Sequence, residues 1–233
     1  MKLTRDIDWD LVTQEFRESK PFNHVAIDNF FLPEVAERIS SEFPDFDDTT
    51  LWHYRNPLEN KKVLNYWDKF PPITYDAFIY LGREEFLNNI RRMVGLDEIW
   101  LDYGLNGGGW HMHGPGGNLN VHLDYNIHPK LGEQRKLNII IYMTKDWNND
   151  WGGGLELWSA DENGRPKECT KLVDNVFNRA VIFDTTQNSW HGLPKYLTCP
   201  PGVHRKSLAA YYVRPAPEGS EQRYRALFAP REE

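Results

Sequence analysis

Residues 118–127, NLNVHLDYNI, contain the pair of side chains best suited to chemistry in this chain, His122 and Asp124. In a β-strand, residues i and i+2 project side by side from one face. An imidazole nitrogen and a carboxylate oxygen can therefore reach the same cation. A His-x-Asp pair arises often by chance, so the interpretation as a metal site needs a third ligand from elsewhere in the chain.

His191 is the candidate for that third ligand. It lies 69 residues after His122, in NSWHGLPKY, just after the apolar run RAVIFDT at 179–185. Two histidines and one carboxylate form the facial triad of non-haem Fe(II) oxygenases. Such a triad leaves open positions on the metal for a chelating cosubstrate and dioxygen.

The alternation within 118–127 has two interpretations. It predicts one polar face and one apolar face. The polar face would carry Asn118, Asn120, His122, Asp124 and Asn126. An ordinary half-exposed strand shows this pattern, with its polar face in water. The alternative is a strand whose polar face lines a wet cavity inside a barrel, and only this alternative encloses the metal pair.

A candidate anion-binding residue follows in RKSLAAYYV, residues 205–213. Arg205, Ser207, Ala209 and Tyr211 would share one face of a strand. Small residues beside an inward arginine leave room for a dicarboxylate, and a guanidinium can bind a carboxylate through two hydrogen bonds. The plain alternative is an arginine in solvent at the start of a strand.

The residues before 98 have mainly helical patterns. Apolar residues recur at helical spacing over 8–19 and 32–43, whereas 24–30 alternates like a strand. Residues 73–95 predict one long helix, or two helices broken near Gly82, with Gly95 at the end.

From residue 98 the chain has nine short β-rich runs separated by Gly, Asn, Asp and Pro. These runs are 98–104, 109–113, 118–125, 136–144, 154–160, 171–174, 179–185, 189–193 and 205–213. Their number and length favour an antiparallel sandwich or barrel. KLNIIIYMT, at 136–144, is nearly all apolar, so both of its faces should be covered. We therefore expect one domain over 1–233, with helical support at 1–97, a β core at 98–213 and a surface tail at 214–233.

The ordered motifs resemble the Fe(II)/2-oxoglutarate-dependent oxygenases, and among them the prolyl-4-hydroxylase-like group. The matching pieces are HLD at 122–124, His191 followed by Gly192, and RKSL at 205–208. IYMTKDW followed by WGGGLELW, at 141–158, is similar to the third and fourth strands of that family.

The resemblance implies a mainly β fold, a double-stranded β-helix (a cupin-like jelly roll) buttressed by N-terminal helices. It implies Fe(II), 2-oxoglutarate and O2 as cofactors, with His122, Asp124 and His191 as iron ligands. By the same resemblance, Arg205 is the cation for the distal carboxylate of 2-oxoglutarate, and Tyr142 and Ser207 are its hydrogen-bonding neighbours. Some relatives use lysine as the cation, and a one-residue shift of register would exchange Arg205 for Lys206. The R-x-S pattern favours Arg205.

The implied activity is hydroxylation of an unactivated C–H bond with release of succinate and CO2. The expected substrate is a prolyl residue in a peptide or a related amino acid. An oxygenase of a non-proline metabolite and a non-catalytic jelly-roll binding module are the alternatives. A cupin using His111 and His113 is disfavoured, because the Glu that such a site needs is missing from GPGGNLN. Arg135, at the start of its strand, is expected at the cavity rim.

The resemblance implies a peptide or a small molecule as the partner, and composition disfavours nucleic acid and membrane as partners. The 233 residues include 27 Lys plus Arg and 34 Asp plus Glu, for a net charge of −7. This acidic balance disfavours nucleic-acid binding, which depends on neutralising phosphates. No apolar run is long enough to cross a membrane, and the start of the sequence lacks the apolar core of a signal peptide. Two cysteines form no framework, so we expect free thiols and a cytoplasmic protein.

Overall fold

The computed structural model describes residues 2–230, and its main feature is one antiparallel sheet of 13 strands that closes almost into a barrel. The mainly β jelly-roll architecture expected from the sequence is confirmed. The strands are β1 (His24–Ile27), β2 (Trp52–Asn56), β3 (Glu59–Leu64), β4 (Trp100–Leu101), β5 (Gly109–His113), β6 (Asn118–Leu123), β7 (Gln134–Tyr142), β8 (Leu155–Ala160), β9 (Pro166–Val173), β10 (Ala180–Asp184), β11 (His191–Leu193), β12 (Arg205–Arg214) and β13 (Leu227–Phe228).

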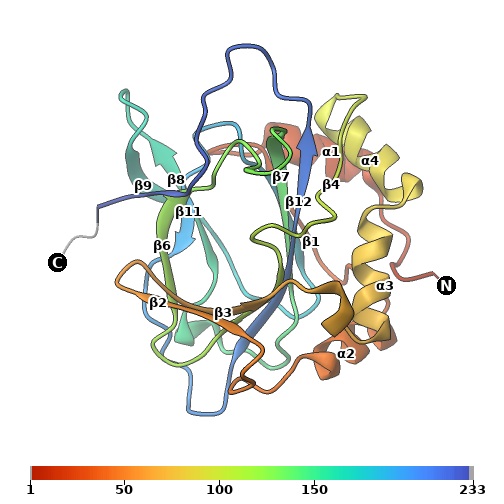
Figure 1. Cartoon of the computed structure of the whole chain (residues 1–233), viewed down its shortest axis with the longest axis vertical. Coiled ribbons are helices and arrows are strands. Elements are labelled where there is room, and N and C mark those ends of the chain that lie inside the picture. The colour runs from red at the N-terminus through yellow and green to blue at the C-terminus, as the bar shows by residue number, and fades with distance from the viewer. Residues whose placement is uncertain (1, 231–233) are drawn as a thin grey trace.

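The strand order brings distant parts of the chain together. Along the sheet it is β1-β10-β7-β12-β5-β3-β6-β11-β8-β9, with β2 on β3, β4 on β12 and β13 on β6. Four α-helices lie together on one side of this barrel (Figure 1). They are α1 (Trp9–Glu18), α2 (Pro33–Glu42), α3 (Pro72–Leu81) and α4 (Glu84–Val94), and two 3-10 turns occur at Trp67–Lys69 and Asn149–Trp151.

Strand β7 is covered on both faces, as its apolar sequence predicts. Leu137, Ile139 and Ile141 are fully buried and belong to the main core, which the helices share through Phe16, Phe78 and other residues. The alternate residues of β7 face the interior of the barrel. The helices therefore hold the outer face of the strands whose inner face forms the site.

Local signals explain where the helices begin and end. The Asp8 side chain accepts hydrogen bonds from the backbone N–H groups of Asp10 and Leu11, which caps α1. The helical region at 73–95 is a pair, broken at Gly82, where the Tyr103 ring leaves no room for a Cβ atom. Gly95 ends α4 with φ of 70°, the left-handed conformation that glycine accepts at helix ends.

The hairpin of β2 and β3 has no counterpart among the elements expected from the sequence. All five residues of β2 are exposed, and most of β3 is half-buried, so neither strand has the apolar alternation of a buried face. Asn56 makes the turn, because its side-chain oxygen accepts from the N–H groups of Leu58 and Glu59. Strand β3 pairs with β5 and β6, so this hairpin closes the gap between the two halves of the barrel.

The sequence predicted that the side chains of β6 alternate strictly between two faces of the sheet, and this prediction is wrong. His191 pairs with His122, but Leu193 pairs with Leu119, so β6 has one extra residue and a β-bulge at this point. Leu119, His122 and Asp124 consequently line one cavity, whereas the Asn120 side chain donates outside it to the carbonyl of Ala229. The interpretation of the polar residues as lining the interior holds for His122 and Asp124 and fails for Asn118 and Asn120.

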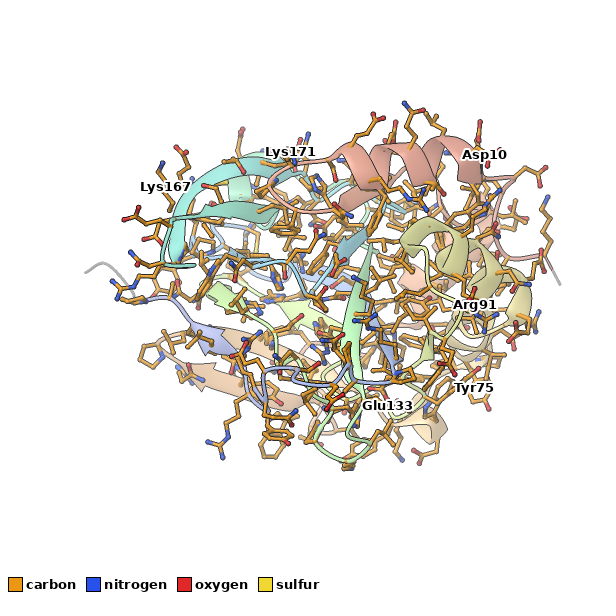
Figure 2. The ribbon with its side chains drawn as sticks, turned by 90° about the horizontal axis from the view of Figure 1, so that it is seen from above. Asp10, Tyr75, Arg91, Glu133, Lys167 and Lys171 are labelled. Carbon is orange, nitrogen blue, oxygen red and sulfur yellow. The ribbon has the colours of Figure 1, made fainter. Side chains whose placement is uncertain are left out.

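The C-terminal segment crosses the outside of β6. Phe228 pairs with His122 through β13, and the N–H of Ala229 donates to the carbonyl of Val121. Charged side chains such as Lys167 and Lys171 on β9 point away from the body of the molecule (Figure 2). Both cysteines are free thiols, as expected. Within residues 2–230, every helix is too short or too polar to cross a membrane.

Candidate metal centre and carboxylate pocket

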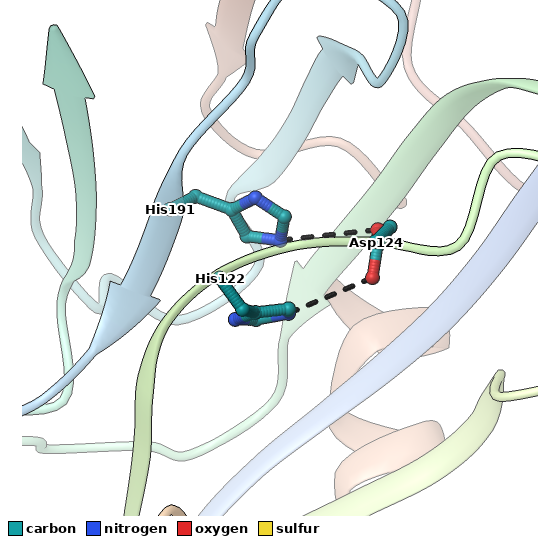
Figure 3. A group of neighbouring side chains, drawn as sticks. All are labelled: His122, Asp124 and His191. Carbon is teal, nitrogen blue, oxygen red and sulfur yellow. Dashed lines mark ion pairs between the residues drawn. The ribbon is translucent and has the colours of Figure 1, made fainter. Parts of the chain in front are cut away.

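His122, Asp124 and His191 converge inside the barrel, where the sequence predicts a metal site (Figure 3). Each offers one ligand atom, and these atoms lie within 4.8 Å of one another. His122 Nε2 is 3.6 Å from Asp124 Oδ1, and His191 Nε2 is 3.8 Å from Asp124 Oδ2. The direct pairing of β6 with β11 produces this proximity of residues that are distant in sequence.

The backbone fixes the orientation of both imidazole rings. His122 Nδ1 lies 2.9 Å from the carbonyl oxygen of Asn120, and His191 Nδ1 lies 2.7 Å from that of Ser189. A carbonyl oxygen only accepts, so each Nδ1 carries the proton and each Nε2 keeps its lone pair for a ligand. Metal-binding histidines are commonly held in this way.

The charge states at the three residues suit a cation. Burial alone would raise the pKa of Asp124, but the Arg135 charge and the two imidazoles hold it well below the usual range of a carboxyl group. Burial lowers the pKa of His191 to about 4, and the neighbouring His122 adds to this effect. At neutral pH the site therefore offers a carboxylate and a neutral imidazole, the forms in which these side chains bind metals.

Asp124 Oδ2 is the clearest sign of an absent partner. This atom is buried and has no hydrogen-bond partner among residues 2–230. Buried carboxylate oxygens in proteins are normally paired. A divalent ion held by Oδ2 and the two Nε2 atoms would satisfy it, so the donor set and its geometry fit a metal of the iron type.

Arg205 faces the same cavity as the three residues above and is buried, with 2% of its surface exposed. Its Nε donates to the carbonyl of Gly153, and its Nη1 donates weakly to Ser207 Oγ at 3.4 Å. Among the described residues it has no carboxylate partner, and burial lowers its pKa. An unpaired buried charge costs several kcal/mol, so this guanidinium is suited to an anionic ligand.

Tyr142 and Ser207 lie beside Arg205, as the resemblance implies. The Arg205 guanidinium carbon is 5.0 Å from the centre of the Tyr142 ring. The Tyr142 hydroxyl is buried and lacks a hydrogen-bond partner in the described part of the chain. Burial raises the pKa of this phenol, so it stays protonated and able to donate. The three side chains thus present unused donors to one point of the barrel.

The register of β12 places Arg205 inward and Lys206 outward. Arg205, Ser207, Ala209 and Tyr211 all line the cavity. The Lys206 ammonium instead lies 5.5 Å from the centre of the Phe43 ring, between the barrel and α2. The orientation favoured by the R-x-S pattern is the one in the structure.

Other residues lining the cavity differ in how visible they are in the sequence. His111 and His113 face the cavity, whereas Trp110 and Met112 lie in the helical core. Lys61 reaches the cavity from the β2–β3 hairpin, and no sequence signal indicated it. Arg135 also lies deeper than the rim position expected, because it forms an ion pair with Asp124.

The fold and the site define a class: a jelly-roll barrel with two histidines and a carboxylate around one interior point. Residues 108–213 match the family described as the 2OG-Fe(II) oxygenase superfamily. This part of the chain, a little under half of it, is therefore similar to that superfamily and, within it, to the prolyl hydroxylase-like members. The family uses Fe(II), 2-oxoglutarate and O2, and the His-Asp-His triad fits the iron site.

A curated relative is the prolyl 3-hydroxylase OGFOD1 of Mus musculus, which is 29% identical over 84 residues. That alignment covers 36% of this chain and 15% of the mouse protein, so the chain matches only a small part of this relative.

Two solved structures share the fold. A Pseudomonas putida prolyl-4-hydroxylase aligns with a TM-score of 0.63 at 16% identity, over 88% of this chain and 100% of that one. A prolyl hydroxylase from Trichoplax adhaerens, in complex with a hypoxia inducible factor peptide fragment, aligns with a TM-score of 0.58 at 15% identity. That alignment covers 90% of this chain and 94% of the other.

Proposed function

We propose that this protein is an Fe(II)- and 2-oxoglutarate-dependent dioxygenase that hydroxylates a prolyl residue in a peptide or a related amino acid. The main support for this proposal is that two features lie in the same barrel interior. One is the convergent group of His122, Asp124 and His191, and the other is the buried Arg205, which has no carboxylate partner among residues 2–230. A metal site alone would not need this cation. A dicarboxylate that reaches from the metal to Arg205 accounts for both.

His122, Asp124 and His191 would hold the iron through their Nε2, Oδ2 and Nε2 atoms. The bound iron would supply the oxidising chemistry with O2 and 2-oxoglutarate, with release of succinate and CO2. The role of the chain is to hold three ligands on one side of the ion and leave the other side free. The hydrogen bonds from each Nδ1 to a backbone carbonyl keep the ligand atoms directed inward.

Arg205, Tyr142 and Ser207 would bind the distal carboxylate of 2-oxoglutarate. The guanidinium supplies the charge, and the phenol and hydroxyl supply further donors. Because all three are buried, the hydrogen bonds form where water does not compete strongly for the carboxylate. This end of the cavity orients the cosubstrate and contributes no group to the reaction itself.

The prolyl substrate class is supported by the resemblance to prolyl hydroxylases in sequence and in fold. The fold likeness extends over most of the chain, whereas the sequence likeness to the mouse protein covers about a third of it. Lys61 from β3 and His111 from β5 line the same cavity as the triad.

A succinate-release assay tests this function. Purified protein with Fe(II) and 2-oxoglutarate is supplied with proline-containing peptides, free proline and other amino acids, with Asp124→Ala as the inactive control. We expect succinate above background with a proline-containing substrate, and a product heavier by one oxygen atom. Turnover only with a substrate that lacks proline would retain the oxygenase and reject the substrate class. No turnover with any substrate from a whole-cell peptide and metabolite extract would reject the proposal.

A further inference from the structure

Arg135 is the other buried cation of the barrel, and it faces the metal-binding carboxylate. Its side chain is 1% exposed, and its Nη1 lies 3.3 Å from Asp124 Oδ1. Its Nη2 donates to the carbonyl of Asn106 at 2.9 Å. The guanidinium therefore contacts one oxygen of Asp124 and leaves Oδ2 without a hydrogen-bond partner within residues 2–230.

Two tyrosine rings hold this guanidinium in place. Its central carbon lies 3.5 Å from the centre of the Tyr125 ring and 3.3 Å from the centre of the Tyr211 ring. The Tyr125 hydroxyl also donates to the carbonyl of Asn106, the acceptor that Arg135 uses. Stacking between two rings stops the guanidinium from swinging away when Asp124 binds a cation.

The positive charge of Arg135 beside Asp124 disfavours binding of a cation by that carboxylate. Arg135 must therefore contribute something other than metal affinity. A free carboxylate can bind a metal through one oxygen or through both. Two-oxygen binding by Asp124 would occupy a position that a chelating keto acid needs. An ion-paired Oδ1 is not available for this.

On the basis of the proposed function, we propose that Arg135 is a positioning residue that reserves Asp124 Oδ1, so that only Oδ2 binds the metal and the cosubstrate positions stay open. The protein thereby gives up some affinity for the metal and gains affinity for 2-oxoglutarate. A purely structural ion pair would have the opposite signature, because its loss would weaken metal binding.

The test uses Arg135→Met, which removes the charge and keeps much of the side-chain volume between the rings. Co(II) binding is titrated by its visible absorption, and 2-oxoglutarate binding to the Co(II)-loaded protein is measured by calorimetry. We expect Co(II) to bind Arg135→Met about tenfold more tightly than wild type and 2-oxoglutarate to bind about tenfold more weakly. Arg135→Lys should lie between the two, and Arg92→Met, at an exposed arginine, should match wild type.

Weaker Co(II) binding by Arg135→Met, or unchanged binding of both ligands, would overturn the inference. If Arg135→Met does not fold, Tyr125→Leu replaces it. This variant removes one wall of the stack and keeps the charge, and it should shift both affinities in the same directions by smaller factors; unchanged affinities in it would overturn the inference. Failure of wild type to bind Co(II) at all would instead reject the proposed metal site.

Discussion

The buried ionisable side chains of the barrel differ in whether they have a charged or hydrogen-bonding partner. Asp124 is opposed by Arg135, whereas Arg205 has no such partner among residues 2–230. His113, paired in register with Arg205, is buried with both ring nitrogens unused by the described chain. These differences give each side chain a separate experimental signature.

Arg205→Met should raise the concentration of 2-oxoglutarate needed for half-maximal binding. Hydrogen bonds to a charged group contribute about 2 kcal/mol, which corresponds to a factor of roughly 30. Calorimetry on the metal-loaded protein measures this. Lys206→Met is the matched control, because Lys206 points to the helical side, and it should bind 2-oxoglutarate like wild type. The reverse result for the two variants would refute the assignment of the cation.

His113 should make the fold less stable as the pH falls. Burial, together with the charges of Arg205 and Lys61 and the nearby His111, lowers the pKa of His113 well below its ordinary value. Between pH 7 and 5 the unfolded chain gains a proton here that the folded chain does not, so acid favours unfolding. This residue contributes up to about 1.4 kcal/mol per pH unit to that slope.

Urea unfolding at several pH values measures this effect, with His113→Asn as the comparison. The free energy of unfolding of the variant should fall less steeply with decreasing pH than that of wild type. Parallel slopes for the two proteins would contradict a lowered pKa of His113 in the folded protein.

The strands, rather than loops, bring the site together. β6 and β11 pair so that His122 and His191 lie opposite each other, and the bulge in β6 sets which residues face inward. Gly192 is required beside the bulge, because a Cβ atom there would lie 2.8 Å from the carbonyl oxygen of Leu119 and 2.9 Å from that of Asn120. The spacing of the metal ligands therefore depends on a residue that has no side chain.

Gly192→Ala should disturb the pairing of β6 with β11. Backbone atoms must move to admit the methyl group, at a cost of about 1–3 kcal/mol, and Co(II) affinity should fall because the two imidazoles separate. Thermal unfolding and Co(II) titration measure both effects. Gly132→Ala is the control, since Gly132 has φ of 70° and open space around it, so this variant should lose some stability and keep wild-type Co(II) affinity. Equal Co(II) affinity in Gly192→Ala and wild type would contradict this role of the glycine.

How much the sequence predicts depends on whether a feature is local or needs closure of the barrel. Alternation and chemistry located His122, Asp124, His191 and the inward face of β12, because these follow from strand geometry and from what a metal and a carboxylate require. The β6 bulge is invisible, because Asn120 and Val121 continue the alternation. The β2–β3 hairpin lacks a buried face. The contact of Arg135 with Asp124 depends on the connection from β6 to β7, where Ile127 pairs with Gln134 and the N–H of Arg135 donates to the carbonyl of Asn126.

At the level of the whole molecule, the helices support the sheet from outside and the barrel interior contains the proposed site. The helices lie on one side of the sheet and share a hydrophobic core with β7 and β12 (Figure 1). The described C-terminal segment adds β13 against β6, the strand that carries His122 and leads directly into Asp124. The result is an enclosed point at which a metal and a dicarboxylate can be held together.

The most direct test of the central claim is an anaerobic titration of the protein with Fe(II) and 2-oxoglutarate, followed by visible absorption. Chelation of 2-oxoglutarate by protein-bound Fe(II) gives a weak metal-to-ligand band. We predict this band for wild type, its absence when either component is omitted, and its loss in Asp124→Ala. A folded, iron-loaded wild-type protein that gives no band with 2-oxoglutarate would contradict the account.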